Sequence, residues 1–162
     1  MYELHNLQIN SYPDNRIPDV MGQHIIEFHR ANRLFRKQRR MAMLNRVWSL
    51  FTRRCLLLKP LTSAALSSGN YRGVQPVEIS RIQGSESRVE DFDNQFNPLR
   101  ENARERWTRI GMLMMMGEPL PAVELIQVGD EYYVRDGHHR ISAARALGYR
   151  HIDAVVTAWQ PA

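Results

Sequence analysis

The spacing of apolar residues predicts one long helix near the start of the chain. Between about Gln23 and Leu58, apolar side chains recur at intervals of three, four and seven residues, as on one face of an α-helix. Pro60 lacks the amide hydrogen that a helix interior needs, so we expect the helix to stop before it. The apolar face comprises Ile25, Phe28, Leu34, Phe35, Met41, Leu44, Val47, Trp48 and Phe51.

Different patterns on either side of this helix divide the chain into four parts. Residues 1–22 have no sustained periodicity and contain prolines and a glycine, which predicts an irregular leader. Residues 23–60 form a basic helical arm, and the small, polar residues 61–73 are expected to act as a linker. Residues 74–158 show the mixed pattern of a compact α/β domain.

Short runs with the pattern of a strand and short runs with the pattern of a helix follow one another within residues 74–158. Apolar and polar residues alternate in the first run, as in a half-buried strand, and Gly117 fits the C-terminal cap of a helix. A strand, a polar turn, a helix and a last strand close the domain. We therefore expect a βαβ-like unit whose helix begins at the carboxyl end of a strand. The expected elements are strands at 77–82, 122–128, 132–135 and 152–157, and helices at 99–116 and 141–147.

Composition limits the class of protein and its surroundings. A chain of 162 residues, 43% apolar and 24% charged, has enough apolar material for one core of ordinary size. Its single cysteine, Cys55, excludes an internal disulfide and a cysteine-based zinc site, which suits a reducing compartment. No apolar run reaches the roughly 18 residues of a membrane-spanning helix, and no signal peptide is recognisable. We therefore expect a cytoplasmic protein without a transmembrane segment.

The positive charge is concentrated in and around the predicted helix. Residues 28–77 contain eleven Lys or Arg and no Asp or Glu, which favours a polyanionic partner. Residues 29–59 could track the phosphates of DNA or RNA, lie on an anionic membrane, or pack against the α/β domain or a second copy in a homodimer. Packing is the default for the apolar face. The residues assigned to nucleic acid are Arg33, Arg36, Lys37, Arg39 and Arg40.

The run Asp136-Gly137-His138-His139-Arg140 carries the most specific chemistry in the chain. Gly137 permits a sharp turn into the following helix, whose first amides lack partners and can hold an oxyanion. Arg140 supplies a forked cation, and His138 and His139 can donate hydrogen bonds or exchange a proton near neutral pH. Asp136 could cap the helix, bind a cation or accept a hydroxyl proton. In the simpler alternative, Asp136 is only a helix cap and both histidines are solvated.

A second polar cluster follows the strand predicted at 77–82. Two residues of the cluster are assigned to phosphate, one acid to general-base chemistry, and two further acids to magnesium. In the alternative, the cluster is a solvated loop that its two phenylalanines, Phe92 and Phe96, anchor in the core. The assignments are Ser85 and Arg88 for phosphate, Glu86 for the base, and Asp91 and Asp93 for magnesium.

The chain resembles the ParB/sulfiredoxin-like superfamily over roughly residues 74–158. The resemblance rests on residues 133–144, with Leu120 to Val123 before them and Leu147-Gly148 after them. In ParB proteins the corresponding turn resembles Gly-Glu-Arg-Arg, in sulfiredoxin Gly-Cys-His-Arg, and in the free serine kinases Asp-Gly-X-His-Arg, which is nearest to this chain. The resemblance implies a small α/β (α+β) domain with a mixed sheet, in which the turn holds the phosphates of a nucleotide.

The sequence also departs from each of these groups. The catalytic cysteine of sulfiredoxin would fall on His138, so sulfinic acid reductase activity is not expected. The paired arginines and the helical DNA-reading domain of ParB partition proteins are missing. Serine kinases place a catalytic glutamate after the first strand, and Glu86 is the nearest candidate for that role.

The residues and the resemblance together leave two functions open. The first is a nucleotide-binding protein that, if catalytic, transfers or hydrolyses a phosphoryl group of ATP, ADP or CTP with magnesium. The second is a DNA- or RNA-associated ParB-like module, or a nuclease-like protein, that uses the basic helix. In the first, the phosphates contact Gly137, His138, His139, Arg140, Ser85 and Arg88, and catalysis falls to His138, His139, Glu86 and Asp136.

Overall fold

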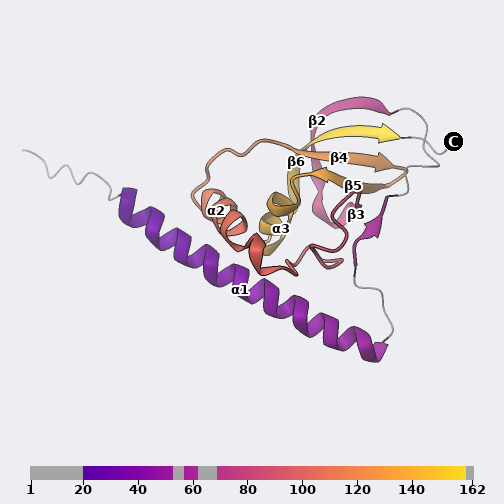
Figure 1. Ribbon diagram of the computed structural model, residues 1–162. Coiled ribbons are helices and arrows are strands. Elements are labelled where there is room, and N and C mark those ends of the chain that lie inside the picture. The colour runs from indigo at the N-terminus through magenta and orange to yellow at the C-terminus, as the bar shows by residue number, and fades with distance from the viewer. Residues whose placement is uncertain (1–19, 53–56, 62–68, 160–162) are drawn as a thin grey trace, which may run out of the picture.

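The computed structural model describes residues 20–52, 57–61 and 69–159, and it shows a mixed sheet with helices packed on one side (Figure 1). The helices are α1 (Val20–Thr52), α2 (Arg104–Met115) and α3 (His138–Ala146). α3 packs on the sheet, α2 lies beside α3, and α1 runs across the outside of both. The expected α/β class with a long preceding helix is therefore confirmed. Residues 1–19 of the expected leader, 62–68 of the expected linker, and Cys55 lie outside the described residues.

Six strands form the sheet in the order β1-β3-β5-β4-β6-β2. β3 runs parallel to both β1 and β5, and β4 runs parallel to β6. The β4–β5 and β2–β6 pairs are antiparallel. The strands are β1 (Lys59–Pro60), β2 (Asn70–Glu78), β3 (Ile82–Ser85), β4 (Val123–Val128), β5 (Glu131–Asp136) and β6 (His151–Trp159).

The turn between β4 and β5 and the ends of two helices follow local sequence signals. Gly129, with a φ of 59°, and Asp130 join β4 to β5 as the two-residue turn expected there. Gly117 follows α2 with a φ of 73°, and its amide donates to the Met114 carbonyl at 3.1 Å. Gly148 ends α3 in the same way, with a φ of 82° and a bond to the Arg145 carbonyl at 3.0 Å. These expectations are confirmed.

Two buried clusters hold the layers together. The larger lies between the sheet and α3 and includes Val123, Val134 and Ile141, each with no exposed surface. The smaller joins all three helices, because the Phe35 and Trp107 rings lie 5.6 Å apart and Ala143 of α3 belongs to the same cluster. The middle of α1 is thus part of the folded body.

Three expected element boundaries are wrong. The helix expected over residues 23–58 runs instead from Val20 to Thr52, and Leu58 is buried beside the sheet. The single strand expected at 77–82 is divided into the end of β2, a 3-10 turn at Ile79–Arg81 and the start of β3. Residues 70–73, expected in the linker, belong to β2. In each case pairing with a distant strand decides the structure, and local pattern does not reveal it.

The βαβ-like unit expected around α3 is also wrong in its pairing. β5 and β6 are not neighbours, because β4 lies between them and runs antiparallel to β5. The two-residue turn forces β5 beside β4, which leaves the other edge of β4 for β6. The parallel crossover therefore connects β4 to β6. α3 nevertheless begins directly after the carboxyl end of β5, as expected.

Only part of the predicted apolar face of α1 packs on the body, namely Leu34 and Phe35. Ala31, Phe35 and Ala42 are buried, whereas Met41, Leu44, Val47, Trp48 and Phe51 are exposed. Small side chains allow α1 to approach α2 closely: a Cβ built on Gly111 of α2 would lie 3.4 Å from the Ala31 Cβ. The large apolar residues therefore point away from the body. Among the described residues, no helix combines the length and apolarity needed to cross a bilayer.

Candidate anion-binding site

The candidate site forms where two parallel strands end side by side. Ser85, the last residue of β3, pairs in register with Val134 of β5, and α3 begins two residues after β5 ends. The carboxyl ends of β3 and β5 therefore meet at the start of α3. Ligands commonly bind at such an edge of an α/β sheet.

Gly137 turns the chain from β5 into α3. Its φ is 97°, and a Cβ built on it would lie 2.5 Å from the Val123 Cγ1, so only glycine fits without distortion. The helix starts at His138, three residues earlier than predicted, which places both histidines and Arg140 in its first turn. The Ile141 amide donates to the Gly137 carbonyl at 3.0 Å, so the amides of residues 138–140 have no acceptor within the helix.

Asp136 does not cap α3, because no side chain makes a capping hydrogen bond at this helix start. Its Oδ2 instead accepts a hydrogen bond from Arg140 Nη2 at 2.7 Å. Nη1 of the same guanidinium donates to the Pro121 and Ala122 carbonyls, the latter at 2.8 Å. Arg140 is therefore held rigidly beside the turn, with part of its hydrogen-bonding capacity already used.

Ser85 and His138 form a buried hydrogen-bonded pair that joins β3 to α3. The two side chains lie 2.7 Å apart, from Ser85 Oγ to His138 Nε2, and both residues are almost fully buried. Ser85 Oγ also accepts from the amides of Ser87 and Arg88, at 3.2 and 3.0 Å. Both of its acceptor positions are used, so the hydroxyl donates, and His138 Nε2 at 2.7 Å is a closer acceptor than the Val134 carbonyl at 3.4 Å. This places the His138 proton on Nδ1. Ser85 acts here as a positioning residue.

Phe92 lies against both imidazoles. Its ring stacks on His138, with centroids 6.0 Å apart, and meets His139 edge-on at 5.4 Å. Phe92 and Phe96 are fully buried, so they anchor the loop after β3 in the core, as the simpler alternative predicted for them. The histidines are buried too, which excludes the expectation of solvated surface groups.

Burial makes both imidazoles hard to protonate. Burial, with smaller contributions from the nearby Arg88 and His139, lowers the pKa of His138 to about 4. Burial likewise lowers the pKa of His139 to about 4, with Arg106 as the next contributor. Both rings are neutral at pH 7, so they can donate hydrogen bonds there but are poor proton carriers in the unliganded protein.

His139 differs from His138 in lacking a partner. Its Nδ1 is buried and has no hydrogen bond to any residue that the structure describes. An unpaired buried polar atom costs about 1–3 kcal/mol, so it indicates a missing polar partner. The side chain lines a cavity of about 20 Å³ at the start of α3, which has room for about one water molecule.

Three arginines from three segments surround that cavity. Arg88 follows β3, Arg106 comes from α2 and Arg140 from α3, and all three line the cavity with the two imidazoles and Gly137. Arg88 has a single distant carboxylate partner, Asp91 at 3.8 Å, and Arg106 makes no ion pair with any described residue. Arg106 was not predicted as a site residue. Only the packing of α2 on α3 brings it there, and no sequence signal shows that packing.

The acidic residues expected in the site have other partners. Glu86 accepts from Arg135 Nε at 3.0 Å and does not line the cavity. Asp91 pairs with Arg100 Nε at 3.0 Å. The carboxylate of Asp93 is buried and accepts four hydrogen bonds, from the Gln95 and Asn97 amides and from the side chains of Asn97 and Asn45. Asp93 therefore orders its own loop.

These contacts do not fit a magnesium ion held by the protein. The oxygens of Asp93 are occupied by N–H donors, and those of Asp91 face guanidinium groups. Among the described residues, no group of three or more His, Cys, Asp or Glu side chains is arranged to hold a metal ion.

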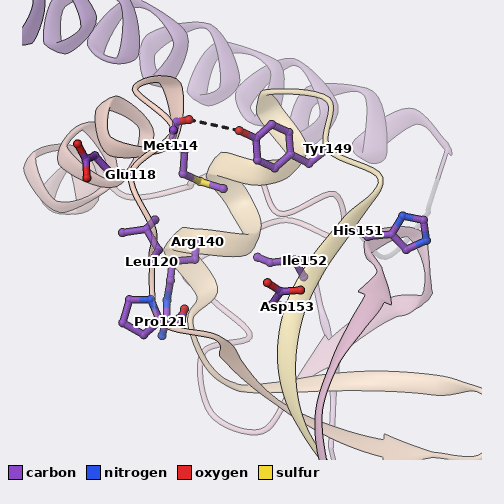
Figure 2. Close-up of a pocket in the computed structure, with 10 residues that line it drawn as sticks. Met114, Glu118, Leu120, Pro121, Arg140, Tyr149, His151, Ile152 and Asp153 are labelled. Carbon is purple, nitrogen blue, oxygen red and sulfur yellow. Dashed lines mark hydrogen bonds between the residues drawn. The ribbon is translucent and has the colours of Figure 1, made fainter.

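A larger cavity of about 280 Å³ lies on the other side of Arg140 (Figure 2). Apolar side chains and two carboxylates line it, and Figure 2 shows Asp153 from β6 and Leu120 from the segment before β4 on opposite sides of it. The Tyr149 hydroxyl donates to the Met114 carbonyl at 3.3 Å across one end. Arg140 lines both cavities, so a ligand bound at the turn could extend into this one.

The nucleic-acid residues predicted on α1 are separate from this site. Arg39 forms an ion pair with Glu101, next to α2. The other four, Arg33, Arg36, Lys37 and Arg40, are exposed on α1. None of them makes an ion pair with a residue that the structure describes. The structure therefore keeps the α3 cluster and the α1 cluster as two distinct groups of cations.

No protein-family model and no curated protein matches the chain. Among solved structures, the fold is similar to that of sulfiredoxin from Arabidopsis thaliana, with a TM-score of 0.42 and 17% sequence identity. The similarity covers 54% of this chain and 86% of that chain. The chemistry of the site follows from its own contacts.

Proposed function

We propose that the chain binds the phosphate group of a nucleotide where α3 begins. The observation that carries the proposal is the convergence of Arg88, Arg106 and Arg140 on one cavity at the unpaired amides of α3. Guanidinium groups around one cavity repel one another, and an oxyanion between them replaces this repulsion with charge-assisted hydrogen bonds. The amides and the dipole of α3 favour the same charge.

The unpaired nitrogen of His139 supports the same ligand. A neutral imidazole can donate one hydrogen bond, and a phosphate oxygen would accept it from Nδ1. His138 is held by Ser85 through Nε2 and carries its proton on Nδ1, as derived above. Both histidines are therefore suited to hold an oxyanion in the neutral form.

The contacts support binding more directly than turnover. Glu86, the expected general base, is paired with Arg135, and the two imidazoles are too acidic as imidazolium ions to stay protonated near pH 7. A bound dianion would stabilise the protonated imidazoles and raise their pKa. The pKa of each histidine would then change with the charge of the ligand, and binding itself would need no proton transfer.

The cavity beyond Arg140 supports a nucleotide over a bare phosphate ion. Its volume of about 280 Å³ is near the lower end of small-molecule sites. Leu120, Tyr149 and Ile152 offer apolar surface for a base, and the carboxylates of Glu118 and Asp153 can accept hydrogen bonds from sugar hydroxyls. Magnesium would enter coordinated by the nucleotide's phosphates.

Calorimetric titration of the full chain with phosphate, ATP, ADP and CTP, each with and without magnesium, tests the proposal. We expect Arg106→Gln to weaken binding roughly tenfold or more, because the variant loses one charge-assisted hydrogen bond to the phosphate. Arg109→Gln is the matched control: Arg109 is also on α2 but is exposed and pairs with Glu105. If no phosphate compound binds the wild type at millimolar concentration, or if both variants lose affinity equally, the proposal is wrong.

A further inference from the structure

The outward side of α1 carries a group of large apolar side chains that are exposed. Seven residues in its last three turns are between 44% and 80% exposed, although α1 is packed against the body along its opposite side. We call this group the apolar end of α1. It consists of Met41, Met43, Leu44, Val47, Trp48, Leu50 and Phe51.

The helical spacing explains why the body cannot cover the apolar end. Residues 31, 35 and 42 face the body, and they define one side of the helix. Leu44, Trp48 and Phe51 are spaced four and three residues apart, so they form one stripe. At 100° per residue this stripe lies roughly opposite the packed side. Figure 1 shows α1 as a straight rod whose two ends extend past α2 and α3.

Four cations precede the apolar end on the same outward side. Arg33, Lys37 and Arg40 fall within about 40° of Leu44 around the helix axis, and Arg36 lies at the edge of this sector. None of the four forms an ion pair with a residue that the structure describes. Between Val20 and Thr52 the helix has seven Lys or Arg and one acidic residue, Glu27. The uncovered side is therefore both strongly cationic and strongly apolar.

We propose that this side of α1 docks on an anionic lipid bilayer. Large apolar side chains would enter the boundary between headgroups and acyl chains, and the neighbouring cations would contact lipid phosphates. Trp48 and Phe51 are residue types that favour this boundary. Lipid phosphates supply the complementary charge and the acyl region supplies the apolar environment, so one partner accounts for both features.

The two other partners account for one feature each. A nucleic acid would neutralise Arg33, Arg36, Lys37 and Arg40, but its phosphate backbone offers the large exposed side chains no apolar environment. A second copy packed through the same helix would cover the apolar end, but it would bring seven more Lys or Arg alongside and only one acidic residue of that helix, Glu27, to pair with them.

Co-sedimentation of the full chain with vesicles tests the inference. We expect binding to vesicles of phosphatidylcholine with about one third phosphatidylglycerol, little binding to pure phosphatidylcholine, and release at high salt. The double variant Leu44→Asn and Phe51→Asn should lower partitioning at least tenfold, and the quadruple Gln variant of the four cations should remove the preference for anionic vesicles. Tyr71→Asn with Val74→Asn, which removes equally exposed apolar residues from β2, is the matched control and should bind as the wild type does.

Three outcomes would overturn the inference. One is a wild type that does not bind anionic vesicles. Another is a concentration-dependent dimer, by analytical ultracentrifugation, that Leu44→Asn with Phe51→Asn dissociates. The third is retention on DNA or RNA that the quadruple Gln variant abolishes while the double Asn variant leaves it unchanged. The substituted side chains are exposed, so thermal melting should show that every variant folds.

Discussion

The chain contains two groups of cations that differ in what surrounds them. At the start of α3, arginines from three separate segments converge on a small cavity beside two buried imidazoles. Along α1, four cations from consecutive turns lie on an open helix surface, next to exposed apolar side chains. The first arrangement is concave and convergent, and the second is extended and convex.

The difference teaches that charge count does not identify the ligand. Residues 28–77 hold the conspicuous block of eleven basic residues, whereas residues 78–162 contain more acids than bases. The convergent site nevertheless lies mainly in the second region, because folding brings Arg88 and Arg106 to Arg140 and pairs most of the acids elsewhere. A small anion needs a few cations at one point, and an extended surface needs many along a line.

The largest effect should come from breaking the turn that assembles the convergent site. Gly137→Ala combines a left-handed backbone, φ 97°, with a Cβ that would meet Val123 at 2.5 Å. We expect a loss of about 3–5 kcal/mol in the free energy of unfolding, from backbone strain plus steric overlap, and loss of nucleotide binding. Urea unfolding monitored by circular dichroism measures the stability.

Gly148→Ala serves as the control for that prediction. Its φ of 82° imposes similar backbone strain, but a Cβ there would meet nothing within 4 Å. It should lose only about 1–2 kcal/mol. Arg36→Gln on the open surface of α1 should change stability by less than about 0.5 kcal/mol. Equal losses for the two glycine variants would mean that the close approach to Val123 is not real.

A smaller effect should appear when the pH is lowered. Burial lowers the pKa of His138 and of His139 from 6.5 to about 4 in the folded protein, so between these values the unfolded chain binds protons that the folded one does not. The contribution of these two histidines to the free energy of unfolding is therefore fully present above about pH 6.5, and it is lost as the pH falls toward 4. The expected loss between pH 7 and pH 5 is about 2 kcal/mol per imidazole.

The contribution of one imidazole can be isolated by difference. His139→Gln removes one titrating group, so the drop in unfolding free energy from pH 7 to pH 5 should be about 2 kcal/mol smaller than in the wild type. The comparison uses the pH-dependent difference, so any constant cost of the substitution cancels. An unchanged drop would contradict the burial of a neutral His139.

Much of the α/β domain could be predicted because its signals are local. The alternation and turn at Gly129-Asp130 located β4 and β5, and Gly117 and Gly148 marked the ends of α2 and α3. The Asp-Gly-His-His-Arg run marked the turn before α3, although the helix begins at His138, three residues before its expected start. These features depend on neighbours within a few residues.

The features of the fold and the site that the sequence did not predict depend on contacts between distant segments. The packed side of α1 is set by Ala31 and Ala42, which hydrophobic periodicity ranks below the larger residues that in fact stay exposed. The place of β4 between β5 and β6, the burial of Ser85, and the arrival of Arg106 all follow from tertiary packing. Asp93 had the pattern of a metal ligand, but its hydrogen bonds within the loop give it a structural role.

The central claim is that an oxyanion binds beside the neutral imidazole of His139, and an NMR titration of that imidazole tests it directly. The pKa of His139 should be about 4 in chloride and should rise by about one unit or more in sulfate at equal ionic strength, since sulfate stays a dianion over this pH range. Arg109→Gln should show the same rise, and Arg106→Gln a smaller one. A His139 pKa that is the same in chloride and in sulfate would contradict the account.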